Sequence, residues 1–361
     1  GGFSAEELAR IEKRAYALGV KSYVALDVTQ DYYQHAIKYM IFGNVLKNST
    51  YPISVSSERI SQATAIARYA REIGAYYLCH GSTGAGNDQV RFDMIFNIVA
   101  PEIEVIALIR EKRLSREEEI EYLRSHGVDF DFKKAEYSIN QGIWGTSVGG
   151  KETLTSSETL PEEAYPSQLK ETEPRRVTLT FERGEFVALD GKRYDDRIAA
   201  IQALQAVASR YAVGRDMHVG DTIIGIKGRV GFEAAAPMVI IKAHHMLEKQ
   251  TLTKWQLFWK DQISAFYGNH LHEGQYYDPV MRDMEAMLES SQRTVSGDVY
   301  VDLHPYRFVV VGIDSPHDLM SNRFGAYGET MSDWTSEDVK GFGRIFGNQN
   351  KIYYQVNKEK L

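Results

Sequence analysis

The sequence has only one cysteine, Cys79, among its 361 residues. A single cysteine excludes an intramolecular disulfide, and its position in an apolar run predicts a buried side chain. The sequence also has no run of 18 apolar residues and no signal-peptide pattern at its N-terminus, so we expect a cytoplasmic protein. Acidic residues outnumber basic ones by 49 to 42. This balance argues against a nucleic-acid or anionic-membrane partner.

The usual signs of covalent or metal catalysis are missing as well. No Ser/His/Asp or Cys/His arrangement indicates a protein nucleophile, so no catalytic residue of that kind is predicted. His244 and His245 are neighbours in a predicted helix, about 100° apart, and cannot both face one metal. His270 and His272 have strand-type metal spacing, but no third ligand is clustered with them. We therefore predict no metal site.

The first 130 or so residues alternate helix and strand, which predicts an α/β domain with a mainly parallel sheet. Ser4 and Glu7 form a capping box, and Ser115 and Glu118 are expected to cap a later helix. Helices are predicted from 4 to 19, 33–42, 57–73, 88–99 and 115–127, and strands at 23–26, 75–79 and 103–109. An α/β domain normally opens with a strand, and this sequence opens with Gly1, Gly2 and a helix. We therefore expect a first strand and its turn to be missing.

The remainder of the chain predicts an α+β region. Residues 140–174 are polar and rich in glycine, threonine, serine, glutamate and proline, which predicts a linker or a long ordered excursion. Strands are then predicted at 177–181, 185–189, 299–303 and 308–311, and helices at 195–211, 237–248, 254–266 and 279–288. The tail from Trp334 to Leu361 is aromatic and should dock onto another surface.

The most informative stretch is His80-Gly-Ser-Thr-Gly-Ala-Gly-Asn-Asp-Gln-Val-Arg-Phe92. Its glycines follow an apolar strand and precede a helix, where backbone N–H groups and the helix dipole can bind an anion. Asn87 or Asp88 is a suitable N-cap, and Arg91 lies one helical turn further on. The turn therefore offers phosphate-binding amides, an acceptor for an ammonium group and a guanidinium for a carboxylate. The alternative is a capped glycine turn without a ligand.

A second polar cluster leaves two interpretations open. Asp216, His218 and Asp221 are predicted to lie in a glycine-bounded loop, which could bind a polar ligand or form a plain turn.

Four motifs in the chain resemble the argininosuccinate synthase family. The glycine-rich stretch of residues 80–92 is similar to the signature of that family. The other three motifs are Tyr51-Pro-Ile-Ser-Val-Ser-Ser-Glu-Arg59, Tyr137-Ser-Ile-Asn140 with Trp144-Gly-Thr-Ser147, and Gly225-Ile-Lys-Gly-Arg-Val-Gly-Phe-Glu233. The similarity covers essentially the whole chain, in the right order.

The resemblance implies an α/β fold class with three parts. An ATP-pyrophosphatase-like (adenine nucleotide alpha hydrolase-like) domain with a parallel sheet is expected over residues 1–130. An α+β synthetase domain would cover residues 131–333, followed by a C-terminal oligomerisation tail at 334–361. A homotetramer is implied.

The resemblance also implies a reaction and its binding residues. The family condenses L-citrulline with L-aspartate through a citrullyl-adenylate, using ATP with Mg²⁺ as substrate and releasing AMP and pyrophosphate in arginine biosynthesis. Gly81 would contact ATP, and Thr83, Asn87 and Asp88 would hold aspartate. The implied citrulline-binding residues are Tyr51, Ser56, Asn87, Arg91, Ser138 and Ser147.

The chain departs from the family pattern at three places. Gly220 and Phe232 stand where many members have a citrulline-binding glutamate and a tyrosine, and Asp221 is beside the first of them. The N-terminal Ser-Gly-Gly-Leu-Asp-Thr-Ser pyrophosphate loop is also absent. We therefore expect the 361-residue chain to be unstable and to make no product, and the functional protein to have roughly 40 more residues. The alternatives are another ATP-pyrophosphatase-type adenylating ligase and a non-catalytic nucleotide- or amino-acid-binding homologue.

Overall fold

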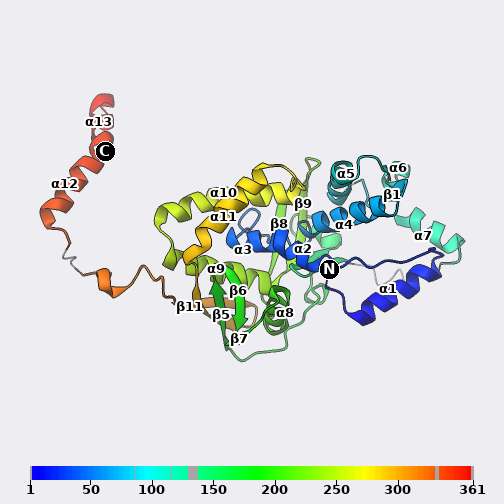
Figure 1. The fold of residues 1–361 in the computed structure, drawn as a ribbon, viewed down its shortest axis with the longest axis horizontal. Coiled ribbons are helices and arrows are strands. Elements are labelled where there is room, and N and C mark those ends of the chain that lie inside the picture. The colour runs from blue at the N-terminus through cyan, green and yellow to red at the C-terminus, as the bar shows by residue number, and fades with distance from the viewer. Residues whose placement is uncertain (1, 85, 115, 129–136, 330–332, 359–361) are drawn as a thin grey trace. The chain divides into compact units, whose positions relative to one another are not determined.

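The computed structural model describes residues 2–84, 86–114, 116–128, 137–329 and 333–358, and Figure 1 shows its course. The chain forms two compact units, Gly1–His317 and Asp318–Leu361. Within the described residues, no helix is both long enough and apolar enough to cross a membrane.

The N-terminal part of the first unit is mostly helical. Its elements are α1 (Ala5–Ala17), α2 (Thr29–Tyr32), the π-helix η1 (Tyr33–Ile37), α3 (Lys38–Phe42), α4 (Glu58–Glu72), β1 (Tyr77–Cys79), α5 (Asp88–Val99), β2 (Glu104–Ile106), α6 (Leu108–Lys112) and α7 (Arg116–Ser125). The predicted Ser4–Glu7 capping box is present at the start of α1. Ser115, the predicted cap of α7, lies outside the described residues.

Three predictions for this part are wrong. Residues 23–26 form no strand, and β2 is only three residues long, with α6 beginning after Ala107. β1 and β2 do pair in parallel, as expected, through Tyr77–Glu104, Leu78–Val105 and Cys79–Ile106. Because side chains alternate along β1, Leu78 is buried while Cys79 is exposed, so the expected burial of the thiol is also wrong.

The remainder of the first unit is α+β, as predicted. Its strands are β3 (Ser138–Gly142), β4 (Gly145–Gly149), β5 (Arg175–Glu182), β6 (Glu185–Leu189), β7 (Lys192–Arg193), β8 (Arg215–Asp221), β9 (Lys227–Glu233), β10 (Gly297–His304) and β11 (Arg307–Asp314). Its α-helices are α8 (Arg197–Ala208), α9 (Ala235–Thr251), α10 (Lys254–Glu273) and α11 (Val280–Ser291). The polar stretch 140–174 begins with the end of β3 and contains β4. Its first part is therefore an ordered sheet region and not a linker.

One antiparallel sheet has the strand order β11-β10-β5-β6-β7. Alternation along β5 buries Val177, Leu179 and Phe181 on one face, and Val177 pairs with Val301 of β10 in the same layer. α8 and α9 pack against this sheet. The arrangement buries one face of the sheet in the main core.

A second antiparallel sheet has the order β3-β4-β9-β8. Its register pairs Asn140 with Ser147, Ser147 with Phe232 and His218 with Val230. Because alternate residues of a strand share a face, Asn140, Ser147, Val230 and His218 lie on the same side of this sheet. The predicted loop containing His218 is wrong, since the residue is in the middle of strand β8.

A buried polar network joins helices α9 and α10. Glu248 on α9 is 2.9 Å from Lys260 on α10, and both side chains are buried. Asn44 donates to one Glu248 oxygen at 2.6 Å, and Gln292 donates to the other at 2.8 Å. His244 bridges Asn44 and Gln292, so one buried carboxylate is bound by a cation and two amides. This set of partners offsets the cost of removing the charges from water.

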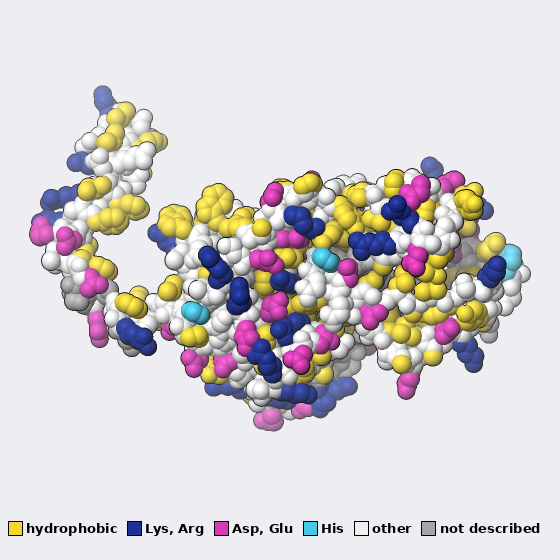
Figure 2. Space-filling model, viewed as in Figure 1, with side chains coloured by type: hydrophobic (Ala, Val, Ile, Leu, Met, Phe, Trp, Pro, Cys, Tyr) yellow, Lys and Arg dark blue, Asp and Glu magenta, His cyan; other side chains and the backbone are white. Residues whose placement is uncertain are grey.

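The second unit contains α12 (Ser336–Phe346) and α13 (Asn348–Asn357). Thr335 and Asp338 form a capping box at the start of α12. Its hydrophobic side chains are largely exposed, and Figure 2 shows such side chains on the surface of this unit. Phe342 and Phe346 stack on one another with ring centroids 5.2 Å apart.

We predict that Lys260→Met destabilises the protein by about 3–5 kcal/mol, because it leaves the Glu248 carboxylate buried without its cation. Urea unfolding followed by circular dichroism measures the change. The double variant Lys260→Met/Glu248→Gln should regain part of the loss, because the uncompensated charge is gone. Equal unfolding free energies for wild type and Lys260→Met would contradict this view of the network.

Candidate functional site

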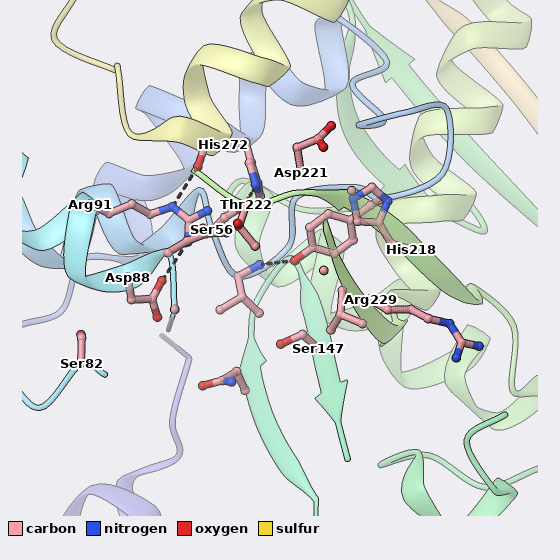
Figure 3. Close-up of a pocket in the computed structure, with 18 of the residues that line it drawn as sticks. Ser56, Ser82, Asp88, Arg91, Ser147, His218, Asp221, Thr222, Arg229 and His272 are labelled. Carbon is pink, nitrogen blue, oxygen red and sulfur yellow. Dashed lines mark hydrogen bonds and ion pairs between the residues drawn. The ribbon is translucent and has the colours of Figure 1, made fainter. Parts of the chain in front are cut away.

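A pocket of about 420 Å³ lies between the glycine-rich turn and one face of the four-stranded sheet (Figure 3). It is formed by the turn and the start of α5, the segment 51–56, the end of α10, and strands β3, β4, β8 and β9. Its lining residues are Tyr51, Val55, Ser56, Ser82, Thr83, Gly86, Asn87, Asp88, Arg91, Asn140, Ser147, His218, Gly220, Asp221, Thr222, Gly228, Arg229, Val230 and His272.

The pocket brings together seven of the nine binding residues predicted from the sequence. These are Tyr51, Ser56, Thr83, Asn87, Asp88, Arg91 and Ser147. The other two, Gly81 and Ser138, do not line it. Ser138 is the first residue of β3 and is exposed, and Gly81 directly precedes the lining residue Ser82.

The charged end of the pocket is built around Asp88 and two arginines. One Asp88 oxygen accepts from Arg91 Nη1 at 2.8 Å, and the other accepts from Arg59 Nε at 2.9 Å. Arg91 also donates through Nε to the backbone carbonyl of His272 at 2.8 Å, which Figure 3 marks. The guanidinium is therefore engaged on two sides, and only its Nη2 is buried without a hydrogen-bond partner in the described structure.

That free nitrogen identifies the point at which a ligand can bind Arg91. Arg91 is buried, and burial lowers the pKa of its guanidinium while the neighbouring Asp88 carboxylate raises it. A buried donor without a partner is costly, so an oxygen of an anionic or polar ligand would complete the arrangement. The spacing of Asp88 and Arg91 on α5 places an acceptor and a donor beside one another.

The side chain of Asn87 does not cap helix α5 as the sequence predicts. Asn87 is the N-cap residue of α5, but its side chain makes no cap hydrogen bond. Instead, its Oδ1 accepts from the backbone N–H of Ile223 at 2.9 Å. Asn87 thereby joins the start of α5 to the turn after β8, and its amide group still lines the pocket.

The segment 51–56 is held from two sides. The Tyr51 hydroxyl accepts from the backbone N–H of Val55 at 3.4 Å. Ser54 also donates to that hydroxyl, at 3.3 Å. On the opposite side, buried Trp144 donates to the carbonyl of Pro52 at 3.1 Å. These bonds fix the Tyr51 ring, which packs against both His218 and Phe232.

The glycine-rich turn is anchored by a chain of three side chains. His80 Nε2 is 2.9 Å from an Asp93 oxygen, and Arg110 donates to the other oxygen at 2.5 Å. His80 Nδ1 accepts from the backbone N–H of Ser82 at 3.2 Å. Because Nδ1 is an acceptor, Nε2 carries the proton, which fixes one neutral tautomer.

Several pocket residues were not predicted as site residues. Ser82, Asn140, Thr222, Arg229 and His272 all line the pocket. Ser82 and Asn140 lie inside the quoted motifs and could have been included on that ground. His272 reaches the pocket from the end of α10, and Arg229 donates to the carbonyls of Glu152 and Thr155 in a segment far away in the sequence. Sequence spacing carries no signal for such contacts.

Among the described residues, no group of three or more His, Cys, Asp or Glu side chains is placed to hold a metal ion. His270 and His272 are on helix α10 and not on a strand, so their spacing is not that of a strand pair. His272 Nδ1 lies 3.1 Å from Ser56 Oγ in the pocket, whereas the His270 ring stacks on Phe266.

Burial favours the uncharged form of two histidines, His244 and His272. Burial, reinforced by the nearby Arg91 and Lys47, lowers the pKa of His272 to about 2. Burial lowers the pKa of His244 to about 4, although the Glu248 carboxylate acts in the opposite direction.

Comparison with known proteins identifies two family models in this chain. The model "Arginosuccinate synthase N-terminal HUP domain" matches residues 2–129, and "Arginosuccinate synthase C-terminal domain" matches residues 137–353. The argininosuccinate synthase of Dictyoglomus turgidum is 34% identical over 96% of this chain and 87% of its own length. That of Xanthomonas campestris is 36% identical over 99% and 91%, respectively. The Methanocaldococcus jannaschii enzyme is 32% identical over 98% and 90%.

We predict that the free energy of unfolding falls as the pH is lowered from 7.5 to 5. The unfolded chain binds protons at His244 and His272 near pH 6.5, while the folded protein resists protonation down to about 4 and about 2. Each histidine therefore makes its full contribution to the free energy of unfolding above pH 6.5. Acidification to pH 5 lowers the free energy of unfolding by about 2 kcal/mol per histidine.

Urea titrations at each pH measure this effect. His272→Gln should reduce the slope, whereas His317→Gln, at an exposed position, should leave it unchanged. A pH-independent stability in wild type, or the same slope in His272→Gln, would show that these rings do not control the acid response.

Proposed function

The chain belongs to the argininosuccinate synthase family, and we propose that its pocket condenses L-citrulline with L-aspartate. The enzyme is an ATP-dependent carbon–nitrogen ligase of arginine biosynthesis. ATP, with Mg²⁺, enters as a substrate and activates the ureido oxygen of citrulline as a citrullyl-adenylate. The aspartate amine then displaces AMP, and pyrophosphate is the other product.

One observation carries this proposal: side chains from both family-matched regions line one pocket. Tyr51, Asp88 and Arg91 come from the N-terminal match, and Ser147 and His218 come from the C-terminal match. A carboxylate and a guanidinium lie side by side there. Such a pair suits two amino-acid substrates, each of which carries both an ammonium and a carboxylate.

For aspartate, we assign Thr83, Asn87 and Asp88. Each Asp88 oxygen accepts one arginine hydrogen bond, which leaves lone pairs for the substrate ammonium. The two arginines also keep the carboxylate in place when the site is empty. Fixing a reactive amine in this way favours attack on the adenylate by orienting the two reactants.

For citrulline, we assign Tyr51, Ser56, Asn87, Arg91, Ser138 and Ser147, with Arg91 as the partner of the carboxylate. The free Nη2 of Arg91 is the atom available for it. The carboxylate therefore binds at one nitrogen of this guanidinium while Asp88 and the His272 carbonyl hold the others.

For ATP, we assign the backbone at Gly81, in the turn that His80 anchors through the Ser82 amide. The site contains no group assigned as a covalent nucleophile. The residues act by orientation and by neutralising charge, which is sufficient when the substrate itself attacks the α-phosphate.

We also propose the domain division at residues 130/131 and 333/334, a cytoplasmic location and a homotetramer. The amphipathic helix α12 supports the tetramer, because Phe342, Ile345 and Phe346 are at least 64% exposed. An apolar face of that kind gains stability by burial against another subunit.

The proposed reaction is tested by measuring AMP and pyrophosphate after the protein is incubated with ATP, Mg²⁺, citrulline and aspartate. Product formation should require both amino acids, and argininosuccinate should be identified by mass spectrometry. The second candidate is an adenylating ligase for a different acceptor, which Gly220 and Phe232 favour because they depart from the family pattern. AMP release with another ureido or amide acceptor, and none with citrulline, would select that candidate.

We expect Asp88→Asn to raise the KM for aspartate about 10- to 100-fold, with a smaller change for citrulline. A hydrogen bond to a charged group contributes roughly 1.5–3 kcal/mol, and the neutral amide loses the charge. Steady-state kinetics with each substrate varied in turn measure the change. Asp216→Asn is the control, since Asp216 is exposed on β8 and outside the pocket. An unchanged KM for aspartate in Asp88→Asn would show that Asp88 does not bind aspartate.

We expect deletion of residues after Asp333 to lower the assembly mass measured by light scattering. The deletion removes the apolar faces of α12 and α13, which are proposed to be buried between subunits. As a milder test, Phe342→Ser/Phe346→Ser should weaken the assembly in the full chain. If both variants keep the wild-type mass, the tail packs on its own subunit.

A further inference from the structure

One pocket residue, His218, has a buried ring nitrogen without a hydrogen-bond partner among the described residues. His218 is only 6% exposed, and its Nδ1 is buried without a hydrogen-bond partner in the described structure. It nevertheless lines the pocket, together with Gly220, Ser147 and Val230. The large majority of buried side-chain polar atoms in native proteins have a hydrogen-bond partner, so this nitrogen points to a partner from outside the chain.

Packing, and not hydrogen bonding, holds the His218 ring in this position. The ring stacks on Tyr51, with centroids 5.1 Å apart and planes inclined by 24°. Tyr51 is itself fixed by its bonds with Ser54 and Val55. The imidazole is therefore oriented in advance, while its Nδ1 has no partner in the part of the chain that the structure describes.

Gly220 makes this position possible. The two residues are two apart on β8, so their side chains would share a face of the strand. A Cβ atom at Gly220 would lie 2.4 Å from His218 Nε2, well inside van der Waals contact. The His218 ring can therefore occupy this position only because residue 220 has no side chain.

The chemistry of the ring suggests what it binds. Burial and the nearby Lys47 ammonium lower the pKa of His218, which keeps the imidazole neutral. A neutral imidazole offers one N–H donor and one acceptor nitrogen. A ureido or amide group has the matching pair, a carbonyl acceptor and an N–H donor. Charged ends of a ligand are matched elsewhere in the pocket, by Asp88 and Arg91.

We propose that His218 is a specificity-determining residue that recognises the neutral ureido group of the acceptor substrate, and that Gly220 makes room for its ring. The assignment rests on the proposed function, because it takes the acceptor to be a ureido amino acid. The β8 side of the pocket would then bind the ureido group. The charged groups bind the amino-acid end of the acceptor, and the neutral imidazole selects its other end.

The test compares citrulline with L-norvaline, which has the α-amino and α-carboxylate groups but no ureido group. Calorimetry should show that His218→Leu weakens citrulline binding about 10- to 100-fold and leaves norvaline binding within about twofold. Gly220→Ala should give a similar loss for citrulline, because the added methyl displaces the ring. The double variant should lose no more than His218→Leu alone, since both changes remove the same contact.

Two further measurements separate recognition from a structural role. His304→Leu, a histidine replacement on β10 outside the pocket, is the control for folding and for binding. In ¹⁵N-imidazole NMR spectra, the His218 signals should move on addition of citrulline and stay in place with norvaline. Equal loss of both ligands in His218→Leu would show that the ring only supports the pocket wall, and would overturn the proposal.

Failure of this proposal can be told apart from failure of the proposed function. If wild type forms AMP with citrulline and His218→Leu binds citrulline as wild type does, the reaction stands and the assignment of His218 is wrong. If wild type neither binds citrulline nor uses it, the proposed acceptor is wrong and the assignment of a ureido contact fails with it.

Discussion

The guanidinium of Arg91 is the interaction on which the pocket depends. It links the Asp88 carboxylate at the start of α5 to the His272 carbonyl at the end of α10, residues that are 184 positions apart in the sequence. A buried cation needs such partners, because removing it from water is costly. Its position therefore fixes the distance between the glycine-rich turn and the helical layer, and the one nitrogen that remains free faces a ligand-sized space.

The two sides of the pocket were predictable to different degrees. Asp88 and Arg91 could be identified because a glycine turn, a helix start and an i,i+3 spacing are local in sequence. Strand β8 was not, because the residues on its pocket face, His218 and Gly220, give no apolar pattern, and only Met217 and Val219 on the other face are apolar. Residues 23–26 show the reverse error. The run is apolar, but a strand also needs a partner, and none pairs with it in the described structure.

The ion pairs of Asp88 lie on the α5 side of the pocket, and two neutral histidines line it together with the charged residues Asp221 and Arg229. Ion pairs surround Asp88, whereas His218 and His272 are held neutral by burial on the sheet and α10 sides. The neutral His272 ring therefore adds no positive charge beside Arg91.

Helix α10 links the buried network to the pocket as a rigid rod. It has Lys260 near its start and His272 near its end, about 18 Å apart along the axis. Lys260 is bound to Glu248, and the His272 carbonyl to Arg91, so both ends are fixed to different parts of the fold. Sliding the helix by one turn, about 5.4 Å, would break both attachments together. The helix therefore holds the His272 end of the pocket at a fixed position relative to the buried network.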